Sequence, residues 1–268
     1  MALRCVYTDL DGTMLGKGAS LLRDAEGNFS TLAVRALEAC HRADVEVVIQ
    51  SGRRKAQVYE DARLIGQPSY IYEMGSGVVD GPEEVFLTGA FQPGEHSVHD
   101  QIEAAGAPRL LMEAFPNRIE PHAPWHTDRL FTHLFRGEVP LDEAAALFAQ
   151  HDLDVRLVDN GITERRSPEL VAGQVHVYHL IAAAAGKGRA VATHMQRRGL
   201  APEEVIGIGD SRGDLEIADV VGRFYLVSNA LDKDPAISSA ANRPNITVTE
   251  EPMIAGFYEA IVRTLAER

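Results

Sequence analysis

The stretch Tyr7-Thr8-Asp9-Leu10-Asp11-Gly12-Thr13 lies at the end of a strand-like run over residues 4–10. Side chains two residues apart on a strand point the same way, so Asp9 and Asp11 are expected to face one pocket. Two carboxylates about 4 Å apart repel each other by about 4 kcal/mol at an effective dielectric of about 20. The pair therefore needs a cation or a shared proton, and Gly12 lets the chain turn sharply behind it.

Strands and helices alternate on both sides of the middle third. Strands are predicted at 45–49, 205–209 and 224–227, and a strand pair at 69–79 is predicted to turn at 75–77. Helices are predicted after Ser30, which is a candidate N-cap, and over 187–198, 214–220 and 253–267. This alternation predicts an α/β fold with a Rossmann-like parallel sheet and helices on both of its faces.

The middle third has a different composition. Residues 91–176 contain seven prolines, seven of the ten histidines and the only tryptophan. Strands are predicted at 130–135 and 154–158, with an alanine-rich helix at 142–150. We therefore expect a smaller α+β domain at 91–176, inserted into a core domain that is built from residues 1–90 and 177–268.

Composition excludes several classes of protein. The 268 residues include 26 Lys+Arg and 39 Asp+Glu, a formal net charge of −13, which argues against a nucleic-acid partner. Two cysteines make neither a disulfide framework nor a four-ligand zinc site. The sequence shows no signal peptide and no apolar run of about 20 residues, so we expect a cytoplasmic protein with no membrane partner, a monomer or a homodimer.

Polar groups also follow the other predicted strands. Ser51-Gly52-Arg53 offers a hydroxyl and turn N–H groups that suit phosphate oxygens. Lys187 supplies a point charge at a helix start, and Gly209-Asp210-Ser211-Arg212-Gly213-Asp214 adds two carboxylates. Open α/β sheets bind ligands at the carboxyl ends of their strands, and hard oxygen ligands of this kind suit Mg²⁺.

Four carboxylates, a hydroxyl and a lysine in this order resemble the haloacid dehalogenase-like hydrolase superfamily. Its four motifs correspond here to residues 9–13, Ser51-Gly52-Arg53, Lys187 and residues 209–214. The resemblance covers the chain from end to end and implies a core with an inserted C2-type cap. The position of the insert, between the second and third motifs, is similar to the type IIB branch.

Within that branch, the chain is similar to relatives of sucrose-phosphate phosphatase and mannosyl-3-phosphoglycerate phosphatase. The similarity rests on residues 185–190, 227–230 and 248–252. Two positions depart from the usual pattern: Gly213 stands where these enzymes usually have Asn, and Met74 replaces the Asn of Glu-Asn-Gly. Neither departure removes a catalytic group, but both bear on the substrate.

The resemblance implies a Mg²⁺-dependent phosphatase for a small phosphorylated metabolite, with a sugar phosphate or a glycosyl-phosphoglycerate as the expected substrate. Asp9 would attack phosphorus to give an aspartyl-phosphate, and Asp11 would act as general acid and base. Ser51 and Lys187 would hold the phosphoryl oxygens. Phosphate contacts are also expected from Gly12, Thr13, Gly52 and Arg53. The metal would lie among Asp9, the Asp11 backbone carbonyl, Asp210 and Asp214.

The insert contains a polar and aromatic cluster over residues 120–136 that suits a sugar or carboxylate leaving group. Trp125, His126 and Arg129 are its candidate substrate contacts. Two alternatives stay open at this stage. One is a phosphomutase of the same architecture, and the other is a phosphate-binding module without catalysis, because fold does not fix function.

Overall fold

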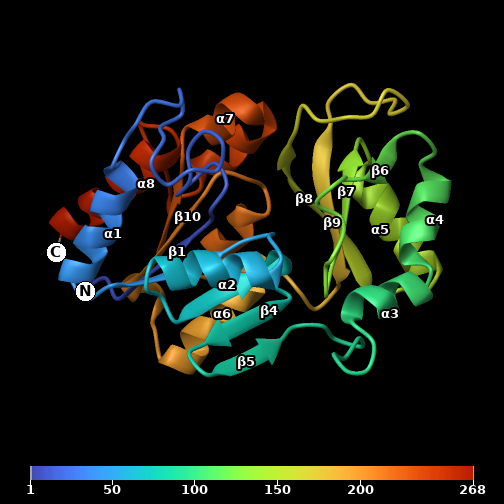
Figure 1. Ribbon diagram of the computed structural model, residues 1–268, viewed down its shortest axis with the longest axis horizontal. Coiled ribbons are helices and arrows are strands. Elements are labelled where there is room, and N and C mark those ends of the chain that lie inside the picture. The colour runs from blue at the N-terminus through green and yellow to red at the C-terminus, as the bar shows by residue number, and fades with distance from the viewer. Residues whose placement is uncertain (1, 268) are drawn as a thin grey trace.

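The computed structural model describes residues 2–267. Figure 1 shows two units of secondary structure side by side, a larger core that carries both chain ends and a smaller cap. The core is built from the first and last parts of the chain, and the cap from the middle. This is the expected α/β architecture with an inserted α+β domain.

The core contains an eight-stranded sheet with β1 at its centre. Strands β12 to β3 of this sheet run parallel, whereas β4 and β5 form an antiparallel extension at one edge. In spatial order the strands are β12 (Ile246–Val248), β11 (Arg223–Leu226), β10 (Val205–Gly209), β1 (Cys5–Thr8), β2 (Glu46–Gln50), β3 (Ser69–Tyr72), β4 (Gly77–Asp80) and β5 (Glu83–Phe86).

Apolar side chains cover both faces of this sheet, as a parallel sheet requires. Val6 belongs to a buried cluster with Phe257 on one face, while its neighbour Tyr7 joins a second cluster with Val191 on the other. The first face carries α1 (Leu32–Arg42), α2 (Lys55–Leu64) and α8 (Met253–Ala266); the second carries α6 (Lys187–Arg198), the 3₁₀ turn η3 (Asp214–Asp219), α7 (Asn229–Lys233) and η4 (Pro235–Asn242). None of the helices within residues 2–267 combines the length and apolar character needed to cross a membrane.

The cap contains an antiparallel sheet in the order β6 (Ile119–Pro121), β7 (His133–Gly137), β9 (His176–Ala182) and β8 (Val155–Ile162). Helices α3 (Val98–Ala104), α4 (Ala107–Ala114) and α5 (Leu141–Gln150) lie on the side of this sheet that faces away from the core (Figure 1). The chain leaves and re-enters the core at one place, because a Cβ on Gly89 would lie 3.2 Å from Cβ of Ala184.

The small sheet extends past the expected domain boundary at residue 176. That residue is the first of β9, which pairs with both β7 and β8. We therefore propose core segments 1–90 and 183–268, with a cap at 91–182.

Several elements differ from the sequence-based expectations. Helix α1 begins at Leu32 with Thr31 as its N-cap residue, while the Ser30 hydroxyl accepts a bond of 3.3 Å from the Leu32 N–H. The predicted helix at 214–220 is the 3₁₀ turn η3. The strand predicted at 130–135 begins only at His133, since the N–H groups of residues 130–132 bond to a core carboxylate instead of a strand. Patterning did not predict β5, β6, β9, α3 or α4.

Candidate active site

Asp9 and Asp11 follow β1 in the loop that opens toward the cap. Leu10 between them is fully buried in the core, so the two acidic residues are left on the opposite side of the loop. Gly12 follows with φ +88°, and a Cβ there would lie 2.3 Å from an Asp210 oxygen. Only glycine fits at this turn, which holds the loop against the carboxylate that follows β10.

Three buried carboxylates meet at this end of the sheet. Asp9, Asp210 and Asp214 each place one oxygen within 4.8 Å of the others. Lys187, the first residue of α6 and 1% exposed, donates to Asp9 at 3.0 Å and to Asp214 at 2.7 Å. The structure thus brings together four of the residues expected in the site.

Asp214 differs from the other two because its oxygens are fully engaged. Its Oδ1 accepts bonds from Lys187 and from Gln50 Nε2 at 2.8 Å. Its Oδ2 accepts the N–H groups of Asp210 and Ser211 and the Ser211 hydroxyl. Burial raises the pKa of Asp214, but Lys187 and these donors outweigh burial and leave the pKa below its usual value. Asp214 is an ionised anchor for Lys187 and for the loop after β10.

Asp9 and Asp210 each keep one oxygen free. Among residues 2–267, no donor bonds to Oδ2 of Asp9 or to Oδ1 of Asp210. Burial raises the pKa of Asp9 well above its ordinary value, and the neighbouring carboxylates add to this against the effect of Lys187. Burial likewise raises the pKa of Asp210. Two buried carboxylates with free oxygens and raised pKa values fit a hard divalent cation between them.

Asp11 has a different setting, because its carboxylate is half exposed and is held by Arg53. The guanidinium donates to both carboxylate oxygens at 2.6 and 2.7 Å, and a third bond of 2.8 Å reaches Asp61. Arg53, expected to contact phosphate, lines the cavity, and its side-chain bonds go to these two carboxylates, so it also orients Asp11.

The loop after β2 carries the expected phosphate-binding groups. Ser51 is buried and, with Gly52, lines the cavity described below. Arg129 of the cap donates to the Gly52 carbonyl at 3.0 Å, so the cap fixes one side of this loop. Neither Thr13 nor Gly12, both expected to contact phosphate, lines the cavity. Thr13 is fully buried, and Gly12 packs closely against the Asp210 side chain.

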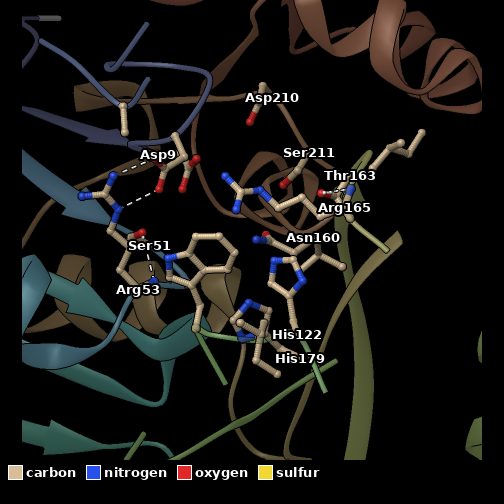
Figure 2. Close-up of a pocket in the computed structure, with 18 of the residues that line it drawn as sticks. Asp9, Ser51, Arg53, His122, Asn160, Thr163, Arg165, His179, Asp210 and Ser211 are labelled. Carbon is tan, nitrogen blue, oxygen red and sulfur yellow. Dashed lines mark hydrogen bonds and ion pairs between the residues drawn. The ribbon is translucent and has the colours of Figure 1, made fainter. Parts of the chain in front are cut away.

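A cavity of about 630 Å³ separates these core residues from the cap. Figure 2 shows the carboxylates of Asp9 and Asp210 at one side of it and the rings of His122 and His179 at the other. Trp125 and Arg129 line it as expected, whereas His126 lies elsewhere, on a second cavity of about 370 Å³. Cap residues that line the main cavity include His122, Trp125, Arg129, Asn160, Arg165 and His179.

The cap side of this cavity carries nitrogen groups without acidic partners. Arg129 is 8% exposed and bonds only to carbonyls and a hydroxyl, and burial lowers its pKa to about 10. The Arg165 guanidinium lies 4.2 Å from the centre of the Trp125 ring. Neither arginine forms an ion pair with a carboxylate of residues 2–267.

Two histidines beside these arginines are also unpartnered. Nδ1 of His122 and Nδ1 of His179 are buried and have no hydrogen-bond partner among residues 2–267. Burial lowers the pKa of His122 to about 4 and lowers that of His179 as well. Both rings are therefore neutral near pH 7 and are available to donate to or accept from a bound group.

Several site residues were not found from the sequence. Lys233 bonds to Asp210, and Glu73 binds the cap segment 130–132. His179 lines the cavity from β9, and Arg165 lines it from the loop before β9. For Glu73 the signal was its place in the Glu-Met-Gly triplet after β3, while the others lie in stretches without a motif.

Comparisons with known proteins agree with this geometry, although no family model matches the chain. A phosphoglycolate phosphatase of Methanoculleus marisnigri is 27% identical over 269 residues, 97% of this chain and 95% of that protein. Among solved structures, the sucrose-phosphatase of Synechocystis, in complex with sucrose and phosphate, covers 98% of both chains with a TM-score of 0.69 at 15% identity. The chain shares the fold of the haloacid dehalogenase (HAD) phosphatases.

A HAD subclass IIB sugar phosphatase also matches, with a TM-score of 0.58 at 14% identity over 97% of this chain and 98% of that one. The fold expected from the motifs is therefore confirmed. The functional names among these relatives are those of phosphatases, which confirms the expected enzyme class, phosphoric monoester hydrolase. The relatives differ in their named substrates, and these HAD neighbours alone do not select one.

Proposed function

We propose that the chain is a Mg²⁺-dependent phosphatase that hydrolyses a small phosphomonoester through an aspartyl-phosphate on Asp9. The observation that carries this proposal is the free oxygen of Asp9, buried at the cavity wall while Lys187 holds the other oxygen at 3.0 Å. A carboxylate fixed through one oxygen presents the second in a defined direction. Attack by that oxygen on phosphorus would split one difficult displacement into two easier ones.

Asp11 is the proposed general acid and base. It lines the cavity beside Asp9, and Arg53 fixes its orientation through two hydrogen bonds. In the first step Asp11 would protonate the departing alkoxide, and in the second it would take a proton from the water that attacks the phosphorus on Asp9. The second step releases inorganic phosphate and restores the Asp9 carboxylate.

The phosphoryl oxygens would be held by Ser51, by turn N–H groups at Gly52 and Arg53, and by Lys187. Asp9 and Asp210 would hold Mg²⁺ through their free oxygens with the Asp11 backbone carbonyl, and Asp214 would act behind them. When bound, the cation neutralises charge on the phosphoryl group. The HAD fold and the donor set support this assignment.

The cap side supports a leaving group that carries an acid. Arg129 and Arg165 have no ion-pair partner among residues 2–267, although the chain carries a net charge of −13, and an anion would offset the burial cost of Arg129. Phosphoglycolate, the substrate in the name of one relative, and a glycosyl-phosphoglycerate both provide a carboxylate. The cavity of about 630 Å³ admits either, and a neutral sugar phosphate would leave both arginines unmatched.

Phosphate release from a panel of phosphomonoesters, with Mg²⁺ and with EDTA, tests the proposal. The panel contains phosphoglycolate, a glycosyl-phosphoglycerate, sucrose phosphate and hexose phosphates, each also assayed for isomer formation. We expect turnover that requires Mg²⁺ and that is lost in Asp9→Asn. After acid quenching, mass spectrometry should find a phosphoryl adduct on the Asp9 peptide. Full activity of Asp9→Asn, or isomer formation without phosphate release, would contradict it.

A further inference from the structure

Lys233 lies at the edge of the carboxylate cluster, and the roles above leave it unused. It is the last residue of α7, and its Nζ lies 2.5 Å from Oδ2 of Asp210. A Cβ on Gly12 would lie 2.7 Å from the same Nζ, so the ammonium lies over the loop that carries Asp9 and Asp11. Lys233 also lines the cavity.

The other two cations of this site are fixed more firmly. Lys187 is 1% exposed and bonds to both Asp9 and Asp214, and Arg53 bonds to both Asp11 and Asp61. The Lys233 side chain is 40% exposed, and Asp210 is its one ion-pair partner among residues 2–267. Lys233 is therefore the cation that leaves its place with the fewest contacts broken.

The charges show why an ammonium lies there. Asp9, Asp11, Asp210 and Asp214 supply four negative charges when ionised, while Lys187, Arg53 and Lys233 supply three positive ones. Burial raises the pKa of Asp210, and Lys233 is the largest influence that lowers it again. The ammonium thus occupies an oxygen of the carboxylate that we assign to the metal, and it repels any second cation placed beside it.

We propose that Lys233 is an internal cation that competes with Mg²⁺ for Asp210 and couples metal binding to phosphate binding. This inference rests on the proposed function, which assigns Asp210 to the metal. Mg²⁺ on the free Oδ1 of Asp210 takes up negative charge that otherwise serves Lys233 on Oδ2, so the bond between Asp210 and Lys233 weakens and the ammonium presents more of its charge to the cavity where the phosphoryl group binds. A phosphate dianion then compensates both the metal and the lysine, so each of the two ligands strengthens the binding of the other.

Titration calorimetry with Mg²⁺ alone, at fixed pH and ionic strength, tests the competition. We expect Lys233→Met to bind Mg²⁺ about tenfold more tightly than the parent protein, because a repelling charge is gone. Lys233→Arg should bind as the parent does. Lys55→Met is the matched control, since it removes a lysine charge that pairs with Glu84 and does not line the cavity, and it should leave the affinity unchanged.

A second titration with inorganic phosphate present tests the coupling. Phosphate should tighten Mg²⁺ binding in the parent protein, and it should do so severalfold less in Lys233→Met. Unchanged or weaker Mg²⁺ binding by a folded Lys233→Met protein, with binding by the parent intact, overturns the inference and leaves the phosphatase proposal standing. Absence of Mg²⁺ binding by the parent overturns both. Should Lys233→Met fail to fold, Lys233→Gln serves the same comparison.

Discussion

A carboxylate's hydrogen bonds decide its role more firmly than its place in a motif. Asp210 and Asp214 belong to one six-residue motif, yet Asp210 keeps a free oxygen while both oxygens of Asp214 are engaged. An ion that bound Asp214 directly would have to displace one of these donors. We therefore expect Asp214 to support the fold as well as the chemistry, and Asp210 to serve the metal.

Replacement of Asp214 by Asn tests this difference. The variant leaves the buried Lys187 with Asp9 as its one acidic partner, and an amide accepts fewer bonds than a carboxylate. We expect a loss of about 3 kcal/mol in the free energy of unfolding, the scale for breaking a buried ion pair, measured by urea denaturation without metal. Ser211→Ala removes one donor to the same carboxylate and should cost about 1 kcal/mol. Equal stability of Asp214→Asn and the parent would contradict this role.

Arg165 offers a test of leaving-group choice at the scale of one side chain. Arg165→Met removes the guanidinium above Trp125, and we expect the KM for phosphoglycolate to rise about tenfold while kcat changes little. The KM for a neutral hexose phosphate should not rise. Arg166→Met is the matched control, because Arg166 bonds to the Ala172 carbonyl and does not line the cavity. Equal effects on both substrates would argue against an acid-binding cap.

At the scale of elements, the short turn η1 (Glu73–Gly75) joins the cap to the core. Glu73 and Met74 both have positive φ, at 43° and 59°, where side chains are strained. The fully buried Glu73 carboxylate accepts the N–H groups of Leu130, Phe131 and Thr132. Together with the bond from Arg129 to the Gly52 carbonyl, these bonds connect residues 129–132, which precede β7 in the cap, to the loops after β2 and β3 in the core.

Substitution of Glu73 tests this connection. Glu73→Ala leaves three N–H groups without an acceptor, those of Phe131 and Thr132 buried and that of Leu130 partly buried, so we expect a loss of about 2–4 kcal/mol in the free energy of unfolding. Glu73→Gln keeps one carbonyl oxygen and should lose less. Amide hydrogen exchange should speed up at residues 130–132 before it does in the core strands. Unchanged exchange at these residues would show that the turn does not hold the cap.

Periodicity and strand ends were enough to predict the central elements. Residues 187–198 and 205–209 were predicted with the bounds that the structure has, because apolar periodicity and glycine breaks coincide there. The cap strands were harder, since β6 has three residues and the two histidines of β9 lie three positions apart, without the alternation of a half-buried strand. Register in such strands depends on partners that are distant in the sequence.

The residues of the candidate site likewise fall into those that the sequence predicted and those that it did not. Asp9, Asp210, Asp214 and Lys187 follow ordered motifs at strand and helix ends, so the parallel sheet had to bring them together. Glu73, Lys233 and Arg165 act through contacts between distant segments, which no local pattern encodes. The pairing of Arg53 with Asp11 was missed for a related reason, because Asp11 lies on a different strand loop.

At the scale of the molecule, buried neutral histidines gather in the cap. Burial lowers the pKa of His122 and of His133 to about 4 and also lowers that of His179. In the unfolded chain these rings take up a proton near pH 6.5. Between pH 6.5 and about 4 the unfolded state therefore binds more protons than the folded state, so stability falls as the pH falls.

Thermal unfolding across this pH range gives the test. We expect the melting temperature to drop steadily below pH 6.5, and each fully shifted histidine to contribute about 2–3 kcal/mol by pH 4. His133→Gln cannot take up a proton and should show a shallower drop than the parent, with the two curves diverging only below pH 6.5. A parallel drop in both proteins would assign acid sensitivity to other groups.

The adjacency of Gly89 and Ala184 has a consequence for how such enzymes acquire new substrates. A folded insert whose two ends lie side by side adds little closure entropy to its host, and it interrupts no strand order in the core. The core retains the proposed nucleophile Asp9 and the loop after β2 whatever is grafted between these two positions. A chimera that carries the cap of a HAD phosphatase there should inherit its choice of leaving group in one step, provided that the graft supplies backbone N–H donors for Glu73.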